Sequence, residues 1–187
     1  ANMPKVNIEK AVSRGGTGEK LSEVSYEGFG PGNISVIVEA ATDNRNRTAQ
    51  EIKGLFEHGG GRLGGPGSVS YNFETKGLMV VEKGSDIDDQ MLKLIDLGVE
   101  EVEETDDGIE IYTEPSKLSE TRDKVDKLGF MVTSYELTQK PKTLQTVSDK
   151  SKASKLVTFL EKLESHDDVQ KVFANLDVPD DVLGNIS

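Results

Sequence analysis

The residues best suited to binding chemistry lie in the segment 42–48, which reads TDNRNRT. Arg45 and Arg47 can each present a planar guanidinium to a phosphate, and Asn44 and Asn46 add amide donors and acceptors. An expected helix follows, and the free backbone N–H groups and dipole at its start favour an anion. The pattern predicts a contact with nucleic acid or the ribosome. It is equally compatible with Asn and Thr capping the helix while the arginines face solvent.

Four further basic residues could enlarge this contact. Lys53 lies about one and a half turns beyond the last of the arginines, and Arg62 follows the end of the expected helix. A short helix expected at residues 4–14 would carry Lys5 and Arg14. We therefore include all four in the predicted contact surface.

Three motifs that could indicate catalysis, a cofactor or a metal fail on their context. The sequence Ser165-His166-Asp167 cannot form a catalytic triad, because adjacent residues do not point at one another in the required geometry. The glycines of residues 59–64 match a dinucleotide fingerprint, but a helix precedes them and a strand is expected after them, the reverse of the required order. Tight turns or close backbone contacts explain them better. Six carboxylates at residues 100–107 lack calcium-loop spacing and are typical of a solvated face. We expect no enzyme activity, no cofactor and no metal.

Composition limits the remaining function classes. The 187 residues carry a net charge of −12, contain no cysteine and include no apolar run long enough for a membrane span. Without cysteine there is neither a disulfide framework nor a thiolate zinc site. Residues 1–76 are neutral overall, residues 77–140 carry −10 and residues 141–187 carry −2. A polyanion could approach the first part and would be repelled by the second, although a solvated acidic surface gives the same asymmetry.

The hydrophobic pattern predicts mixed elements in the first part. Residues 23–26 and the apolar run 34–41 read as strands joined across a Gly-Pro-Gly turn. Residues 44–57 read as an amphipathic helix, in which Thr48-x-x-Glu51 fits a capping box. A glycine-rich loop then leads to an expected strand with Val69, Tyr71 and Phe73 at alternate positions.

The acidic middle repeats a strand–helix–strand pattern twice, and its two Leu-Gly helix ends are 31 residues apart. This is the split βαβ pattern of a ferredoxin-like domain. Residues 77–140 would then be inserted in another ferredoxin-like α+β domain, made of residues 20–76 and 141–187, which insertion at a surface loop permits. Residues 1–19 would hold a helical remnant and a linker. Helix caps are expected at Ser85 and Ser116 in the acidic part.

Four ordered motifs carry a family resemblance. They are ANMPK with NIE near the start, YEGFGPG at 26–32, TDNRNRT at 42–48, and HGG at 58–60 followed by GSV at 67–69 and Phe73. These motifs resemble those of the YebC/PmpR family, which includes the mitochondrial translational activator of cytochrome c oxidase. Family members have a basic helical N-terminal domain and two α+β domains, and this chain begins inside what resembles the last helix of the first.

The resemblance implies a regulator of gene expression that contacts RNA, the ribosome or DNA, mainly through the full-length protein. We expect a ribosome-associated translation factor. A DNA-binding transcriptional regulator is the alternative, and a protein-interaction module is the second. No membrane contact or small-molecule substrate is expected, and the location would be cytoplasmic, or mitochondrial in a eukaryote.

Overall fold

The computed structural model describes residues 21–184, and the chain divides there into two compact units. Unit 1 contains residues 21–73 and 141–184, and unit 2 contains residues 74–140. The sequence placed these boundaries after residues 76 and 140. The predicted helix at residues 4–14, with Lys5 and Arg14, lies outside the described residues. Among the described helices, none is long and apolar enough to cross a membrane.

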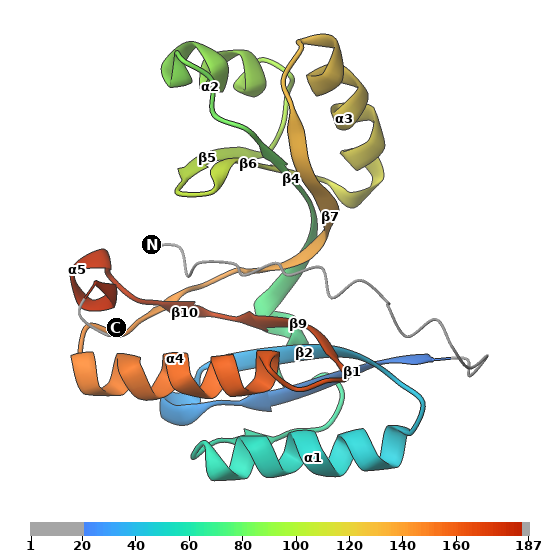
Figure 1. The fold of residues 1–187 in the computed structure, drawn as a ribbon, viewed down its shortest axis with the longest axis vertical. Helices are drawn as coiled ribbons and strands as arrows, with labels where there is room; N and C mark the ends of the chain where they lie inside the picture. The colour runs from blue at the N-terminus through green and yellow to red at the C-terminus, as the bar shows by residue number, and fades with distance from the viewer. Residues whose placement is uncertain (1–20, 185–187) are drawn as a thin grey trace. The chain divides into compact units, whose positions relative to one another are not determined.

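Unit 1 is built on a four-stranded antiparallel sheet with the order β3-β1-β2-β9 (Figure 1). Its strands are β1 (Ser22–Phe29), β2 (Ser35–Thr42), β3 (Arg62–Leu63) and β9 (Val169–Ala174). The predicted turn between the first two strands is a 3-10 turn at Pro31–Asn33. Its proline presets one backbone angle, and Gly32 and Asn33 both adopt positive φ. The turn therefore allows β1 and β2 to pair along their whole length.

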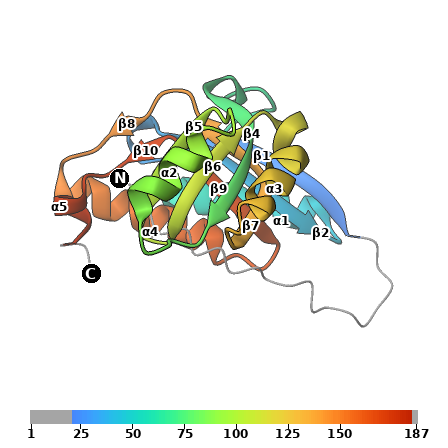
Figure 2. The ribbon, with the colours of Figure 1, turned by 90° about the horizontal axis from the view of Figure 1, so that it is seen from above.

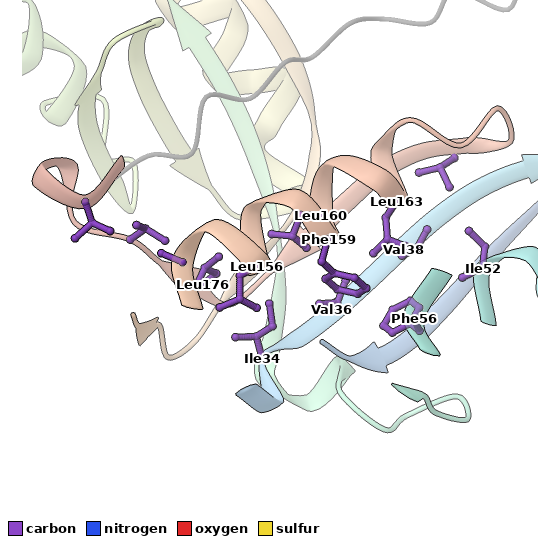
Figure 3. Close-up of a cluster of buried hydrophobic side chains, with 14 residues drawn as sticks. Ile34, Val36, Val38, Ile52, Phe56, Leu156, Phe159, Leu160, Leu163 and Leu176 are labelled. Carbon is purple, nitrogen blue, oxygen red and sulfur yellow. The ribbon is translucent and has the colours of Figure 1, made fainter. Parts of the chain in front are cut away.

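Two helices, α1 (Arg45–His58) and α4 (Lys150–Glu164), cover one face of this sheet. Figure 3 shows their side chains meeting those of β2, with the Phe56 and Phe159 rings edge to face at 5.3 Å between centroids. The buried cluster is Ile34, Val36, Val38, Ile52, Phe56, Ala153, Leu156, Phe159, Leu160, Leu163, Val169, Leu176, Val178 and Val182. Hydrophobic burial of this kind, about 25 cal/mol per Å² of apolar surface, is the main force that holds unit 1 together.

Glu27 organises the glycine-rich loop that follows β3. Its carboxylate accepts hydrogen bonds from the backbone N–H groups of Gly67, Val69 and Ser70 at 2.8–2.9 Å. Partial burial raises the pKa of Glu27, but these hydrogen bonds outweigh it and leave the pKa below its ordinary value. Ile37, Val69 and Phe73 pack together in a second, smaller core.

This loop corrects one prediction. Residues 69–72 are not a strand, because Ser70–Asn72 form a 3-10 turn and β4 (Phe73–Val81) begins only at Phe73. The N–H groups of Val69 and Ser70 donate to Glu27 and are therefore unavailable to a β-ladder. Tyr71 is consequently exposed.

The remainder of unit 1 consists of short elements. The strands β8 (Gln145–Thr146) and β10 (Leu176–Asp177) pair in parallel, and α5 spans Asp180–Leu183. The α+β class is confirmed, with two helices on one face of an antiparallel sheet. The strand order of unit 1 differs from that of a ferredoxin-like domain, because a tight turn, rather than a helical crossover, joins β1 to β2.

Unit 2 has the strand order β5-β6-β4-β7, which is that of the predicted split βαβ pattern. After β4 the elements are α2 (Ile87–Ile95), β5 (Glu101–Thr105), β6 (Gly108–Thr113), α3 (Leu118–Lys127) and β7 (Val132–Pro141). Figure 2 shows α2 and α3 beside the sheet of this unit. A buried cluster from both helices and the sheet fills the space between them: Met79, Val81, Leu94, Ile109, Ile111, Leu118 and Val125.

Three predicted helix caps are wrong. Asn44 caps α1 and Thr48 lies inside that helix, so Thr48-x-x-Glu51 is not a capping box. Asp86, rather than Ser85, caps α2 by accepting from the Asp89 N–H. The start of α3 has no side-chain cap, because a 3-10 turn at Pro115–Lys117 leads directly into it. At α1 and α2 a neighbouring residue with suitable geometry replaces the expected cap, and at α3 none does.

The carboxylate of Glu27 generates a stability prediction. Glu27→Gln should lower the free energy of unfolding by about 2 kcal/mol at pH 7, because a charged acceptor of three N–H groups is lost. Since folding lowers the pKa of Glu27, its contribution is complete above the ordinary value of 4.5 and disappears as the pH falls through the folded value. The difference between wild type and variant in urea unfolding should therefore shrink below pH 4.5.

Glu23→Gln provides the control, because Glu23 is exposed on the same strand. Hydrogen exchange gives a local readout: the amides of Gly67, Val69 and Ser70 should lose protection in Glu27→Gln alone. Unchanged protection of these amides would show that the carboxylate does not hold the loop.

Candidate functional site

The predicted contact segment lies where β2 ends and α1 begins. The Asn44 side chain caps the helix, with its Oδ1 accepting from the Arg47 N–H at 3.1 Å. The Asn44 N–H in turn donates to Thr42 Oγ1 at 2.9 Å. Asn44 is therefore committed to the fold through both its backbone and its side chain. The cap uses the Oδ1 acceptor, and the predicted contact through the Asn44 side chain stays a prediction.

Arg47 is held by carboxylates of its own chain. Its Nη2 lies 2.9 Å from Asp43 Oδ1 and 2.9 Å from Asp168 Oδ2, and its Nε lies 3.9 Å from Glu51. Asp168 lies in the segment before β9, 121 positions after Arg47 in the sequence. The guanidinium charge at the start of α1 is thus already neutralised, which reduces what Arg47 can offer a phosphate.

Asp168 is the centre of this arrangement. Its Oδ2 lies 2.7 Å from the buried Thr48 hydroxyl, which is itself 2.8 Å from that of Thr42. Burial raises the pKa of Asp168, but hydrogen bonds from Thr48, Arg47 and Thr42 outweigh it and hold the pKa below its ordinary value. The carboxylate therefore satisfies buried hydroxyls and fixes Arg47 at once.

Residues 43–47 are all exposed, and among them Arg45 and Asn46 have no side-chain hydrogen bond or ion pair within residues 21–184. The backbone oxygen of Arg45 lies 3.5 Å from the Tyr26 hydroxyl, while its guanidinium has no carboxylate within 4.0 Å among residues 21–184. These two side chains can meet a ligand without breaking an internal contact. The usable part of the predicted segment is therefore narrower than residues 42–48.

The other described residues of the predicted surface have separate environments. Lys53 pairs with Glu57 at 3.8 Å on the exposed side of α1. Arg62 lies over the Phe29 ring, 4.5 Å from its centroid, and donates to Asn33 at 3.3 Å. Neither contacts Arg47, so the structure does not gather the predicted residues into one compact site.

A cleft of about 680 Å³ adjoins Arg47, between α1 and the segment after α4, and both histidines line it. His58 Nδ1 lies 2.6 Å from the Gly54 oxygen, one helical turn earlier. His166 Nε2 lies 3.0 Å from Glu51 Oε2. The Ser165 hydroxyl donates to the Lys162 oxygen at 2.9 Å, and not to a histidine. Ser165, His166 and Asp167 therefore do not form a nucleophile–base–orienter array.

Glu51, His166 and Asp168 could surround a cation on distance alone, since one ligand atom from each lies within 4.8 Å of the others. Their hydrogen bonds oppose it. The Asp168 N–H donates to His166 Nδ1 at 3.1 Å, so the imidazole proton belongs on Nε2, where it faces Glu51. A metal bound at Nε2 would require the proton to move to Nδ1. There it would face the Asp168 N–H, which is also a donor. The guanidinium of Arg47 beside both carboxylates would also repel the ion.

The remaining motifs are structural. A Cβ at Gly59 would overlap the Phe159 ring, and one at Gly61 would overlap the Phe29 oxygen, so close packing explains these glycines. In the acidic hairpin of unit 2, lysines lie among the carboxylates. Lys76 pairs with Glu100 at 2.9 Å, Lys83 pairs with Glu104 at 2.9 Å, and Lys140 pairs with Glu101 and Glu103. This face is ion-paired rather than simply solvated.

Sequence reasoning missed Glu27 and Asp168, the two carboxylates that organise unit 1. Glu27 stands inside the YEGFGPG motif, and that was the available signal. Asp168 offered none, because its partners lie about 120 positions away in the sequence. Their roles follow from folding and not from local spacing.

Comparisons with known proteins agree with this architecture. Residues 21–176 match the family model described as the second and third domain of TACO1/YebC. A probable transcriptional regulatory protein of Dictyoglomus turgidum is 46% identical over 193 residues, covering 100% of this chain and 77% of the relative. One from Moorella thermoacetica is 42% identical and covers 96% and 73%. The crystal structure of a conserved hypothetical protein from Aquifex aeolicus has a TM-score of 0.82 at 40% identity, covering 87% of this chain and 68% of that one.

The network around Asp168 yields a second prediction. Asp168→Ala should lower the free energy of unfolding by about 2 kcal/mol at pH 7, because Thr42, Thr48 and Arg47 lose their shared charged acceptor and Thr48 keeps only neutral ones. Asp167→Ala, one residue away and exposed, should stay within about 0.5 kcal/mol of wild type. Because folding lowers the pKa of Asp168, its contribution should fade as the pH drops below the ordinary value of 3.8. Equal urea midpoints for the two variants would contradict this role.

Proposed function

The chain belongs to the TACO1/YebC family of regulators of gene expression, and we propose that it acts as a ribosome-associated translation factor. The proposal rests on one observation: the two units differ in how many of their basic side chains are paired with carboxylates. Unit 2 is acidic and most of its cations are ion-paired, while unit 1 presents exposed cations that have no carboxylate partner among the described residues.

The ion pairs of unit 2 favour a binding partner that is not purely a polyanion. Its lysines and arginine pair within the unit in Lys83–Glu104, Lys93–Asp89, Lys117–Glu114, Arg122–Asp126, Lys124–Glu120 and Lys140–Glu101. Phosphate binding depends on releasing counterions from the nucleic acid, which paired lysines do poorly. A surface of this kind is better suited to basic protein segments.

Unit 1 supports contact with RNA. Arg45 and Asn46 stand exposed at the start of α1, and Arg62 and several lysines of α4 are also exposed. A ribosome offers both RNA phosphates and basic proteins, so an acidic unit and a cationic unit can each find a complementary surface there. Duplex DNA offers one charge per about 1.7 Å of its axis and would repel unit 2 along any extended contact.

A DNA-binding transcriptional regulator is the second candidate, favoured by the printed names of the relatives, which are probable transcriptional regulatory proteins. Both candidates are non-catalytic. That part of the proposal is supported by the Ser165 hydroxyl, which donates to the Lys162 oxygen and not to a histidine, and by the hydrogen bonds that oppose a metal at Glu51. A protein-interaction module through unit 2 is the remaining alternative.

Two parallel binding measurements separate these functions. The chain should sediment with purified ribosomes, and the association should weaken as salt rises, because phosphate contacts release counterions. A titration onto promoter DNA at the same salt should give weaker binding. Tighter binding to the promoter would favour the transcriptional regulator, and binding to neither partner would favour the interaction module.

Arg45 provides a residue-level test. Arg45→Ala should weaken ribosome binding several-fold and reduce the slope of log affinity against log salt by about 0.7–0.9, as expected for one lost phosphate contact. The free energy of unfolding of this variant should equal that of wild type, since the Arg45 side chain has no ion pair among the described residues. Lys93→Ala is the control, because Lys93 lies outside the predicted contact surface and its charge is paired with Asp89. If both variants bind as wild type does, the start of α1 is not part of the contact.

A further inference from the structure

Unpaired cations are concentrated at one place in unit 1. Lys150, Lys152 and Lys155 lie in the first two turns of α4, are exposed, and pair with no carboxylate among residues 21–184. In unit 2, by contrast, most basic side chains have a carboxylate partner. The first half of α4 therefore carries positive charge that the fold itself does not use.

Lys152 and Lys155 line a cleft of about 440 Å³. Its other walls are Pro31 and Gly32 of the turn, the segment 145–149 and Leu156. Asp149 also borders the cleft, but its carboxylate caps α4 by accepting from the Lys152 N–H at 2.8 Å. The start of the helix is thus already occupied, and the capacity for an anion comes from the lysine side chains.

Arg62 flanks the same turn from β3. It donates to Asn33 Oδ1 at 3.3 Å and lies over the Phe29 ring. Asn33 is the one non-glycine residue with positive φ among the described residues, at 66°. Such backbone conformations persist where the surroundings impose them and are common at binding sites.

The turn is also held by the segment before α4. Gln145 Nε2 donates to the Gly32 oxygen at 3.0 Å, and the Asn33 N–H donates to the Gly30 oxygen at 3.0 Å. Arg62 borders this turn through Asn33, and the two lysines border it through the cleft beside Pro31 and Gly32, although they come from distant parts of the sequence. We call Arg62, Asn33, Gln145, Lys152 and Lys155 the turn surface.

We infer that the turn surface binds the phosphate backbone of single-stranded RNA. The inference rests on the proposed function and assigns its main contact to residues that the predicted segment at 42–48 does not include. Two lysines and one carboxylate line the cleft, and Arg62 borders the turn through Asn33, so the local charge is positive in a chain of net charge −12. The amides of Asn33 and Gln145 can bond ribose hydroxyls or bases.

A single strand suits this surface better than a duplex. A flexible strand can bend into a small cleft and leave again, whereas a stiff duplex cannot follow the walls of the cleft. Lysine recognises phosphate as a point charge without demanding a fixed orientation. Binding would therefore be tolerant of sequence and strongly dependent on salt.

The test compares two variants with the same change in charge. Lys152→Gln/Lys155→Gln removes the two cleft lysines, and Lys93→Gln/Lys124→Gln removes two ion-paired lysines of unit 2. Fluorescence anisotropy measures binding to a labelled single-stranded RNA of mixed sequence and about 16 nucleotides, at several salt concentrations. Circular dichroism and urea midpoints check that each variant folds as wild type does.

The cleft variant should lose about ten- to thirty-fold in affinity near 0.1 M salt, and its log–log salt slope should fall by about 1.4, the value for two lost single-strand contacts. The unit 2 variant should bind as wild type does. A cleft variant that binds as tightly as wild type would overturn the turn surface and leave the proposed function intact. Equal losses in both variants would also overturn it.

Two more outcomes bear on the ligand. If wild type binds neither this RNA nor ribosomes, the proposed function and the turn surface fail together. If wild type prefers a DNA duplex of equal length, and the cleft variant loses that binding, the assignment to single-stranded RNA is wrong. A milder variant, Asn33→Gly, keeps the positive φ and removes the Arg62 partner; it should weaken RNA binding slightly and leave stability unchanged.

Discussion

The contact of Asp168 with the start of α1 determines much of the chemistry of unit 1. One carboxylate, from the segment before β9, accepts from the buried Thr48 hydroxyl and pairs with Arg47. It thereby joins α1 and the end of β2 to the segment before β9 around a single acceptor. The same contact neutralises the guanidinium that the sequence offers most plainly for binding anions. Stability of the fold and availability of charge are therefore coupled at this point.

The two units also differ in how far their lysines are paired with carboxylates of the same chain. In unit 2, Lys76 of β4, Lys83 just after it and Lys140 of β7 lie among the carboxylates of the acidic hairpin, so an apparently solvated face is an ion-pair network. Exposed pairs of this kind contribute little to stability, about 0–1 kcal/mol each, but they remove cations from the surface. In unit 1 the lysines of α4 have no such partners among residues 21–184. A partner that carries both phosphates and basic protein surfaces is consistent with this division.

Local patterns predicted most elements because their signals are local. The apolar run 34–41 became β2, the periodic segment 44–57 became α1, and the twice-repeated pattern of residues 77–140 has the expected strand order. The failures occurred where a distant group took over a local bond. Val69 and Ser70 follow an alternating pattern, yet Glu27 takes their N–H groups and no strand forms. Thr48 has the spacing of a cap, but it lies inside the helix and its hydroxyl faces Asp168.

The sequence by itself determined the α+β class, the acidic middle, and the motifs that indicate the family, because composition, periodicity and short motifs are properties of neighbouring residues. The tertiary structure alone decided which cations remain available. Arg47 meets Asp168 across 121 positions, whereas Arg62 and Lys152 converge on the turn at Pro31–Asn33. Ion pairing depends on distances of a few ångströms, which spacing along the chain does not encode.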